Sequence, residues 1–513
     1  MSRHLAYALI ACLSLAGVVA ALLVTRGGVG LDDDAVYYVS AAQNFVAAGG
    51  LATPFGAPDA RPLTHYAPGF PFALGLLGFM GISPLSAARW VNACFFGANI
   101  WLVACIVFRA TRRSGLALWA AFLMLTSTGM LAVHSRAWSE PMFLFLLLFV
   151  LWLLAQSLDT DRWDLLMAAS FLAMLALLVR YAGVSLVITG LAATVLWAPG
   201  DLRRKAKRCA AFVSFPALAV GVISARNAGS SGVLADRRIL LHPIEAARLR
   251  ALVDHLSAWL LPDIAPFLIR VSVLCLFVAA CCVIARGHVV ERAYTLLETT
   301  LALFAVCYLA TLFLSIALVD VAIQFSYRIL SPAFVACLIL VILRVAEWKP
   351  FPAAWIGAAA RVVLLGLASV CVARAGYWIK RANETGLGFA SPRWTRSGIV
   401  QSIKAMDVRR PIYTNAAAAL YILTGKHVLD IPRKIAFTSG APRPGYESEI
   451  LEMKRQLEAR DGVVVYLNVY GDLSRDFGMK PVVSWPSIDE LQAQIPLDKV
   501  QQSADGAIYE MDR

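Results

Sequence analysis

The stretch Pro141–Ser157, PMFLFLLLFVLWLLAQS, decides the fold class of this chain, because none of its residues carries a charge. A helix needs about 20 predominantly apolar residues to cross the hydrocarbon core of a bilayer. Similar runs recur from Leu5 to Ala373, separated by short polar breaks. They predict a polytopic α-helical membrane protein with about eleven transmembrane helices, at residues 5–24, 88–110, 116–134, 141–157, 164–180, 182–198, 209–225, 264–286, 294–318, 328–346 and 352–375. Residues 164–198 also fit one long helix, so the break at Arg180 is the least distinct.

The composition agrees with a membrane protein. Of the 513 residues, 59% are hydrophobic and 15% are charged, and the mean hydropathy is +0.69. Soluble proteins are about 45–50% apolar and about 25% charged. The first apolar run is longer than the apolar core of a signal peptide, so we expect residues 5–24 to remain as a membrane helix.

The net charge of +13 indicates topology. Short cytoplasmic loops are enriched in Lys and Arg, and most inner loops are basic if the N-terminus lies inside. Their basic residues are Arg109, Arg112, Arg113, Arg162, Arg203, Arg204, Lys205, Lys207, Arg208, Arg286, Arg292, Arg344 and Lys349. We therefore expect no nucleic-acid partner. An odd number of spans places the C-terminal region outside the cytoplasm, beyond the inner membrane of a bacterium.

Several common sites have no sequence support. The ten cysteines lie in or beside apolar runs and form no CxxC pair, so neither a disulfide framework nor a zinc site is expected. The chain lacks GxGxxG after a strand, GxxxxGK[ST] and HExxH. The sequence therefore carries none of the usual signatures of dinucleotide binding, nucleoside-triphosphate binding or zinc-protease activity.

Three regions lie outside the expected spans, at 25–87, 226–263 and 376–513. The last region alternates short strands (411–414, 427–431, 463–467) with helices (416–423, 447–460) and ends in a possible hairpin at 500–510. Ser487–Glu490 matches a capping box. This pattern predicts a small extracytoplasmic α/β domain at 376–513, after a membrane domain at 1–375.

The first outer loop, 25–87, is the most informative region. Asp32, Asp33 and Asp34 precede a stretch, 35–45, whose apolar residues share one helical face. One aspartate would suffice to cap that helix, whereas three adjacent carboxylates raise one another's pKa. The segment His65–Pro71, HYAPGFP, is rigid and aromatic, which suits either a contact with lipid or a plain re-entry into the membrane.

Further candidates lie at the outer ends of expected spans. Glu140 precedes a proline that begins an apolar helix, where an acid could also serve only the helix N-terminus. The basic candidates are Arg180, Arg226, Arg237, Arg238 and Arg328. A guanidinium group can bind two phosphate oxygens at once. The alternative for each arginine is a side chain that only extends to the membrane interface.

Taken together, these residues resemble the GT-C superfamily of membrane glycosyltransferases, and most closely bacterial relatives of the protein mannosyltransferases and aminoarabinose transferases. Four elements carry the resemblance over about residues 1–346: Asp33–Tyr38, His65–Pro71, Ser139–Pro141 with Arg180–Gly183, and Arg328 followed by Pro332. The C-terminal region is similar to extracytoplasmic domains of such proteins, but less specifically.

The resemblance implies transfer of a monosaccharide, with inversion, from a polyprenyl-phosphate donor to a lipid, glycan or protein acceptor outside the cytoplasm. It implies a carboxylate base, Asp33 first and Asp34 second. Substrate binding would fall to His65, Tyr66, Glu140, Arg180, Arg238 and Arg328. The leaving phosphate would be stabilised by arginines or by a divalent metal, Mg²⁺ or Mn²⁺, with Asp33 and Glu140 as ligands.

Two other classes remain open at this stage. A transporter or flippase of lipid-linked saccharides would place charges along a path through the spans, whereas here they gather at one face. A scaffold would use the C-terminal domain only to bind a partner. Among enzymes, an oligosaccharide ligase or polymerase also fits. No internal repeat supports an inverted-repeat transporter.

Overall fold

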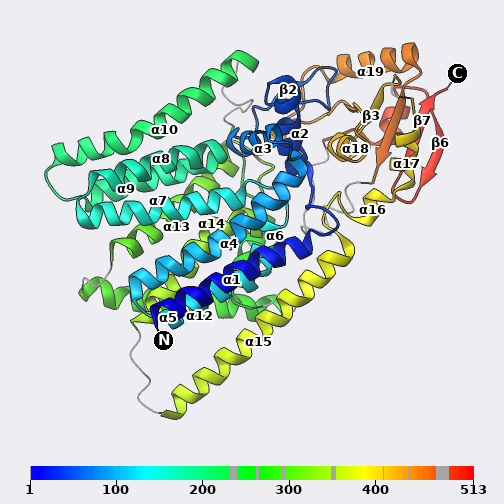
Figure 1. The fold of residues 1–513 in the computed structure, drawn as a ribbon. Coiled ribbons are helices and arrows are strands. Elements are labelled where there is room, and N and C mark those ends of the chain that lie inside the picture. Colours follow the sequence, from blue (N-terminus) through cyan, green and yellow to red (C-terminus); the bar gives the residue numbers. More distant parts are fainter. Residues whose placement is uncertain are drawn as a thin grey trace.

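The computed structural model describes residues 2–231, 240–261, 265–291, 295–347, 354–407, 409–436, 439–468 and 484–512. Long helices run side by side, and the C-terminal elements gather at one end of them, next to α2 (Figure 1). The predictions for Arg237, Arg238, Arg292 and Lys349 fall outside these ranges.

The helices of the membrane region follow the apolar runs of the sequence. They are α1 (Arg3–Val24), α4 (Pro84–Thr111), α5 (Ser114–Thr126), α6 (Thr128–His134), α7 (Glu140–Thr160), α8 (Trp163–Val179), α9 (Val184–Trp197), α10 (Leu202–Ser231), α11 (Ala246–Ala258), α12 (Phe267–Glu291), α13 (Leu296–Leu318), α14 (Tyr327–Ala346) and α15 (Ala354–Thr385).

Within the described ranges, seven helices are long and apolar enough to cross a membrane: α1, α4, α7, α10, α13, α14 and α15. The pair α5–α6, bent by 64°, makes an eighth if it forms one span. The other predicted spans coincide with the shorter apolar helices α8 and α9 and with α12, whose segment Phe267–Ala279 is apolar. A polytopic helical protein is therefore confirmed, while the count of eleven stays a prediction. The break at Arg180 is present, because the 3-10 helix η1 (Tyr181–Gly183) separates α8 from α9.

Helix α15 differs from its prediction in length. It continues past residue 375 to Thr385, so the predicted end of the membrane domain falls inside a helix. Only 6% of its most apolar window is buried by the rest of the chain, which is consistent with a helix that faces lipid along one side of the bundle (Figure 1).

The first outer loop forms α2 (Asp33–Ala48), the short strands β1 (Ala52–Thr53) and β2 (Arg61–Pro62), and α3 (Gly69–Phe79). The helix expected at 35–45 is confirmed. Of the four residues predicted on one face, Ala35, Tyr38 and Ala42 are buried and Phe45 is half-buried. Apolar burial therefore fixes α2 against the bundle.

The C-terminal elements are α16 (Pro392–Thr395), α17 (Gly398–Ala405), β3 (Ile412–Thr414), α18 (Ala417–Thr424), β4 (Leu429–Asp430), α19 (Tyr446–Arg460), β5 (Val463–Leu467), α21 (Ile488–Gln492), β6 (Leu497–Ser503) and β7 (Gly506–Met511). The described strands form a sheet in the order β4-β3-β5-β7-β6. Strand β3 is parallel to β4 and β5, and β7 is antiparallel to β5 and β6. The predicted strands, helices, capping box and hairpin are all present, whereas α16 and α17 were not predicted.

Alternation along the strands divides the sheet between two cores. In β5, Val463, Val465 and Leu467 belong to the core cluster that also contains α17 and α18. Val464 instead packs with the α19 residues Met453 and Leu457 on the other face. Since side chains of a strand alternate between faces, the sheet packs against α17 on one side and α19 on the other.

Candidate active site

The three consecutive aspartates occupy different surroundings. Asp32 is the N-cap of α2: its Oδ1 accepts a hydrogen bond from the Ala35 N–H at 3.0 Å. Both of its oxygens accept from Trp138 Nε1, at 2.9 and 2.8 Å. Asp34 lies 2.5 Å from Arg328 Nη1 and accepts from the Tyr66 hydroxyl at 2.6 Å. Asp32 therefore caps the helix, the role that one aspartate was expected to suffice for. Asp34 does not cap the helix and instead contacts Arg328 and Tyr66.

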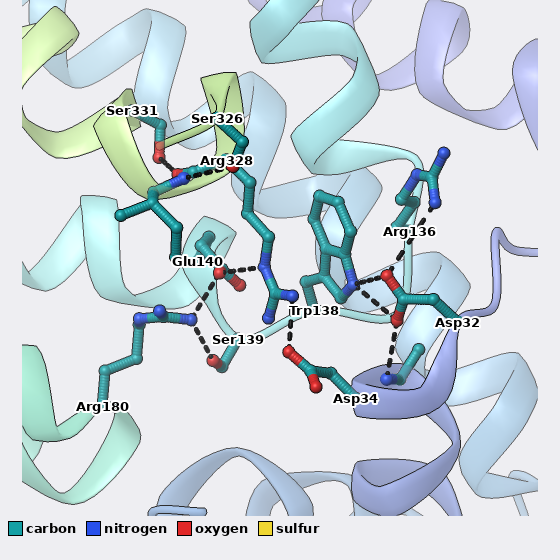
Figure 2. A network of polar contacts seen from close by, with 12 residues as sticks. Asp32, Asp34, Arg136, Trp138, Ser139, Glu140, Arg180, Ser326, Arg328 and Ser331 are labelled. Atoms are coloured by element: carbon teal, nitrogen blue, oxygen red, sulfur yellow. Dashed lines mark hydrogen bonds and ion pairs between the residues drawn. The ribbon is translucent and has the colours of Figure 1, made fainter. Parts of the chain in front are cut away.

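An ion-pair network links four distant parts of the chain (Figure 2). Arg328, at the start of α14, donates through Nε to Glu140 Oε1 at 2.5 Å and lies 2.5 Å from Asp34. Arg180 Nη1 lies 2.5 Å from the same Glu140 oxygen. The Arg328 guanidinium also stacks over Trp138, 4.2 Å from the ring centroid. Glu140 is 1% exposed, and such burial is tolerated because two guanidinium groups compensate its charge.

The loop that carries Trp138 and Glu140 is held by an asparagine of α4. The Asn92 side chain donates to the carbonyl oxygens of Arg136 and Trp138, at 2.7 and 2.9 Å. A second asparagine of α4, Asn99, donates to the Pro141 carbonyl at 3.0 Å. We did not predict these positioning residues, although amide side chains within an otherwise apolar helix were the available signal.

The segment before the aspartates is held on both sides. Gly30 N–H donates to the Ser135 carbonyl at 2.9 Å, and Phe389 N–H donates to the Leu31 carbonyl at 2.8 Å. Gly388, at φ +57°, approaches Leu31 so closely that a Cβ would overlap its carbonyl oxygen, so only glycine fits there. The start of α2 is thus fixed between the 135–137 loop and the entrance to the C-terminal domain.

The aromatic-proline segment packs against the same centre. The Tyr181 hydroxyl donates to the carbonyls of Thr64 and Tyr66, at 3.0 and 3.2 Å. The His65 ring lies 4.8 Å from the Tyr66 ring, edge to face. At Gly69 a Cβ would lie 2.8 Å from the Leu178 carbonyl oxygen, so this close approach also requires glycine. These contacts place the Tyr66 hydroxyl on Asp34.

Asp33 and Asp34 differ in proton affinity. Asp33 is exposed at the surface of the loop, yet desolvation by the surrounding protein, reinforced by the negative charges of Asp32 and Asp34, raises its pKa to about 7. Burial alone would raise the pKa of Asp34, but Arg328 and the hydrogen bond from Tyr66 outweigh it and hold that pKa below its usual range. Asp34 is therefore ionised near neutral pH, while Asp33 can exchange a proton there.

Glu140, one of the two predicted metal ligands, is partly engaged by arginines. Its Oε1 contacts two guanidinium groups, while its Oε2 has no hydrogen-bond partner. Within the described ranges, no group of three or more His, Cys, Asp or Glu residues could hold one ion. The divalent metal expected at Asp33 and Glu140 stays a prediction.

A cavity of about 1180 Å³ adjoins the network. Its lining includes Arg136, which lies 3.9 Å from Asp32 and so marks the end nearest the acids. The other arginines in its lining are Arg250, Arg270, Arg374 and Arg381, and its apolar side chains include Leu123, Met130, Trp259, Phe334 and Leu338. Asp254, the one carboxylate of the described lining, pairs with Arg270. The cavity therefore combines a strong positive charge with apolar walls.

The structure brings together Asp34, Tyr66, Glu140, Arg180 and Arg328 of the predicted site, with His65 against Tyr66. Asp33 lies beside this network without joining its ion pairs, and its side chain is exposed. Arg226 donates to the Leu63 carbonyl at 2.5 Å and so supports the loop. Arg238 lies outside the described residues.

Comparison with solved structures defines the fold. The chain is similar to ArnT from Cupriavidus metallidurans in the apo state, with a TM-score of 0.58, 13% identity and coverage of 96% of this chain and 97% of that one. The same protein bound to undecaprenyl phosphate gives a TM-score of 0.57, 11% identity and 97% coverage of both chains. The archaeal oligosaccharyltransferase AglB from Archaeoglobus fulgidus, in complex with an inhibitory peptide and a dolichol-phosphate, gives 0.57 and 12%, covering 100% of this chain and 74% of that one.

These proteins are GT-C membrane glycosyltransferases. The chain therefore has the GT-C fold, as the sequence resemblance predicted. No family model and no curated protein sequence matches it.

Proposed function

We propose that this protein is a membrane glycosyltransferase that transfers one sugar, a hexose or a pentose, from a polyprenyl-phosphate donor to an acceptor outside the cytoplasm. The cavity beside the acid network is the observation that carries the proposal. Its arginines suit a lipid phosphate, and its apolar walls suit the first isoprene units. The ArnT and AglB structures with undecaprenyl phosphate and dolichol-phosphate support this choice of donor.

In the proposed reaction, an acceptor hydroxyl attacks the anomeric carbon of the donor sugar. Its proton passes to the Asp33 carboxylate, the bond from the anomeric carbon to the phosphate oxygen breaks, and polyprenyl phosphate leaves. Attack opposite the leaving group inverts the anomeric configuration. Asp33 suits the base because its pKa of about 7 matches neutral pH; Asp34 is the second choice, because its ion pair with Arg328 lowers its proton affinity.

The arginines stabilise the departing phosphate. Arg328 is held by two carboxylates and an indole ring, so its guanidinium needs little reorganisation during the reaction. Arg374 and Arg381 lie two turns apart on α15, about 10 Å along its axis, and both line the cavity. We propose that these two residues bind the phosphate of the donor before the reaction, and that Arg328 stabilises the departing phosphate in the transition state.

The proposed topology has eleven spans. Ten are single helices and one is the helix pair α5–α6, each at one of the predicted apolar runs. With the N-terminus inside, the acid network, the first outer loop and the α/β domain from residue 376 lie outside the cytoplasm. The basic loops between spans support this orientation. In a bacterium the protein would occupy the inner membrane.

Sugar transfer and donor transport, measured together, test the function. Purified protein in liposomes would receive a panel of short-chain polyprenyl-phosphate hexoses and pentoses, with a cell-envelope extract as acceptor. We expect release of polyprenyl phosphate and a labelled product with inverted configuration. Movement of intact donor across the bilayer, without cleavage, would instead establish the flippase alternative.

A further inference from the structure

The C-terminal domain contacts the first outer loop beside the aspartates. Gly56 N–H donates to the Val428 carbonyl at 2.8 Å, and Asp430 N–H donates to the Gly56 carbonyl at 3.2 Å. His427 Nε2 lies 2.9 Å from the Ala57 carbonyl. Phe55 stacks on Tyr421 of α18, with ring centroids 5.1 Å apart. Backbone pairing and aromatic stacking together fix this end of the domain to the loop.

That contact brings two charged side chains close to α2, because Phe55 also packs on Tyr37, one turn beyond Asp33, with ring centroids 5.0 Å apart. Asp430 and Arg433 form an ion pair, with 3.7 Å between Oδ2 and Nη2. Their charges act on Asp33, in opposite directions, and also on Tyr37 one turn further along α2. At Gly56, φ +80°, a Cβ would lie 2.8 Å from Asp430 Oδ2, so the loop leaves room for this carboxylate only because residue 56 is glycine.

The pair stays accessible although it lies at an interface between two parts of the chain. The Asp430 and Arg433 side chains are 25% and 27% exposed, and Asp33 is exposed as well. The Arg433 guanidinium stacks on Trp485, 4.7 Å from the ring centroid, which restrains it.

The cavity that we assign to the donor is not lined by Asp430 or Arg433. The cavity is lined by residues 385–388 and Arg136, on the side where Leu31 pairs with the 387–389 segment. An acceptor that attacks opposite the leaving phosphate must therefore approach from outside the cavity. The Asp430–Arg433 pair offers polar groups there, against Gly56 of the loop that packs on α2.

We propose that Asp430 and Arg433 of the C-terminal domain bind the acceptor, and that the acceptor is a carbohydrate. This inference rests on the proposed function and names the acceptor class for the same site. A sugar hydroxyl both donates and accepts hydrogen bonds, so neighbouring hydroxyls can engage the carboxylate and the guanidinium together. A serine or threonine side chain offers a single hydroxyl and cannot engage both groups and react.

The test uses full-length protein in liposomes, with the polyprenyl-phosphate sugar that the wild type cleaves. The acceptor probes are dodecyl glucoside, dodecyl galactoside and a threonine-containing peptide. Charged hydrogen bonds contribute about tenfold or more to binding, so Asp430→Asn and Arg433→Gln should each raise the KM of the accepted glycoside about tenfold. The KM of the donor should stay unchanged, because neither residue lines the cavity assigned to the donor.

Lys434→Gln is the matched control, because Lys434 lies next to Arg433 but pairs with Glu490 of the same domain. It should leave the glycoside KM unchanged. Unaltered glycoside KM in both Asp430→Asn and Arg433→Gln would overturn the proposal, as would transfer to the peptide alone. If the wild type cleaves no donor with any acceptor or with water, the proposed function itself fails. Should Asp430→Asn not fold, Arg433→Gln decides alone.

Discussion

Arg328 and Asp34 lie 294 positions apart in the sequence, yet Arg328 Nη1 is 2.5 Å from Asp34 Oδ2. The same guanidinium contacts Glu140 through Nε. One side chain of α14 thereby joins the first outer loop to the start of α7. Breaking a buried pair leaves an uncompensated charge and typically costs about 3–5 kcal/mol, so this contact contributes both to the fold and to the site.

The first prediction concerns the geometry of that guanidinium. Lysine offers a single point charge and cannot engage two carboxylates in the same way. Arg328→Lys should lower kcat by a factor of about 10²–10³, with a smaller effect on donor KM, because the contact strengthens as the phosphate departs. Steady-state kinetics with a short-chain donor measure this. A lysine variant equal to wild type in both constants would reduce Arg328 to an interfacial anchor.

The second prediction separates the roles of the aspartates. Asp33→Asn should abolish transfer while the protein remains folded and inserted, because the amide cannot accept the proton. Asp32→Asn retains a side chain that can cap α2, so it should keep most of the activity. Transfer assays and thermal unfolding of the purified variants would be compared. Full activity in Asp33→Asn would eliminate Asp33 as base, and full activity in the Asp33→Asn/Asp34→Asn double variant would remove the mechanism.

The third prediction is a pH dependence. Because a base works only when deprotonated, and the pKa of Asp33 is raised to about 7, kcat/KM should fall as pH decreases below about 7. One pH unit below the pKa, activity should be down about tenfold. Initial rates between pH 5 and 9 test this. A profile that is flat from pH 5 to 8 would argue against Asp33 and in favour of Asp34, whose pKa is lowered.

Much of the fold could be predicted because bilayer crossing and strand alternation leave local patterns. The run at 141–157 became α7, and alternating elements after residue 411 became the described sheet. Helix α15 continues to Thr385, beyond the predicted end of its span at residue 375, because the backbone of residues 376–385 stays helical although Lys380, Arg381 and Glu384 are charged. Composition marks where lipid ends, but helical hydrogen bonding continues beyond that point.

The site was predictable as a set of residue types but not as a set of partners. Arg328 and Glu140 were candidates because charges beside apolar runs are costly. That they pair with each other depends on packing between helices distant in sequence. Asn92, Asp430 and Arg433 escaped prediction because a single polar residue in an apolar helix, or an ordinary charge in a small domain, carries no local signal of its contact.

The fourth prediction concerns the donor cavity. Arg374→Gln and Arg381→Gln should each raise donor KM about tenfold, since each removes a charged hydrogen-bond donor to phosphate. Lys380→Gln, an exposed neighbour on α15 outside the cavity lining, should have little effect. Binding of short-chain polyprenyl phosphate, measured by quenching of tryptophan fluorescence, gives the same comparison without turnover. Equal affinities in all three variants would remove these arginines from the donor site.

The fifth prediction concerns orientation. The basic inner loops and the odd number of proposed spans place residue 513 outside the cytoplasm. Alkaline phosphatase fused after Arg513 should therefore be active, and green fluorescent protein at the same position should be dark. The reverse result would mean that the proposed number of spans is wrong by one.

Cleavage of the donor is the most direct test of a lipid-phosphate-dependent glycosyltransferase. Purified wild-type protein and Asp33→Asn would be incubated with radiolabelled polyprenyl-phosphate sugars and a cell-envelope extract, and released polyprenyl phosphate would be measured by mass spectrometry. We predict that the wild type releases polyprenyl phosphate in step with a labelled product, and that Asp33→Asn releases none. Recovery of every donor intact from the wild type, with the protein folded, would contradict the account.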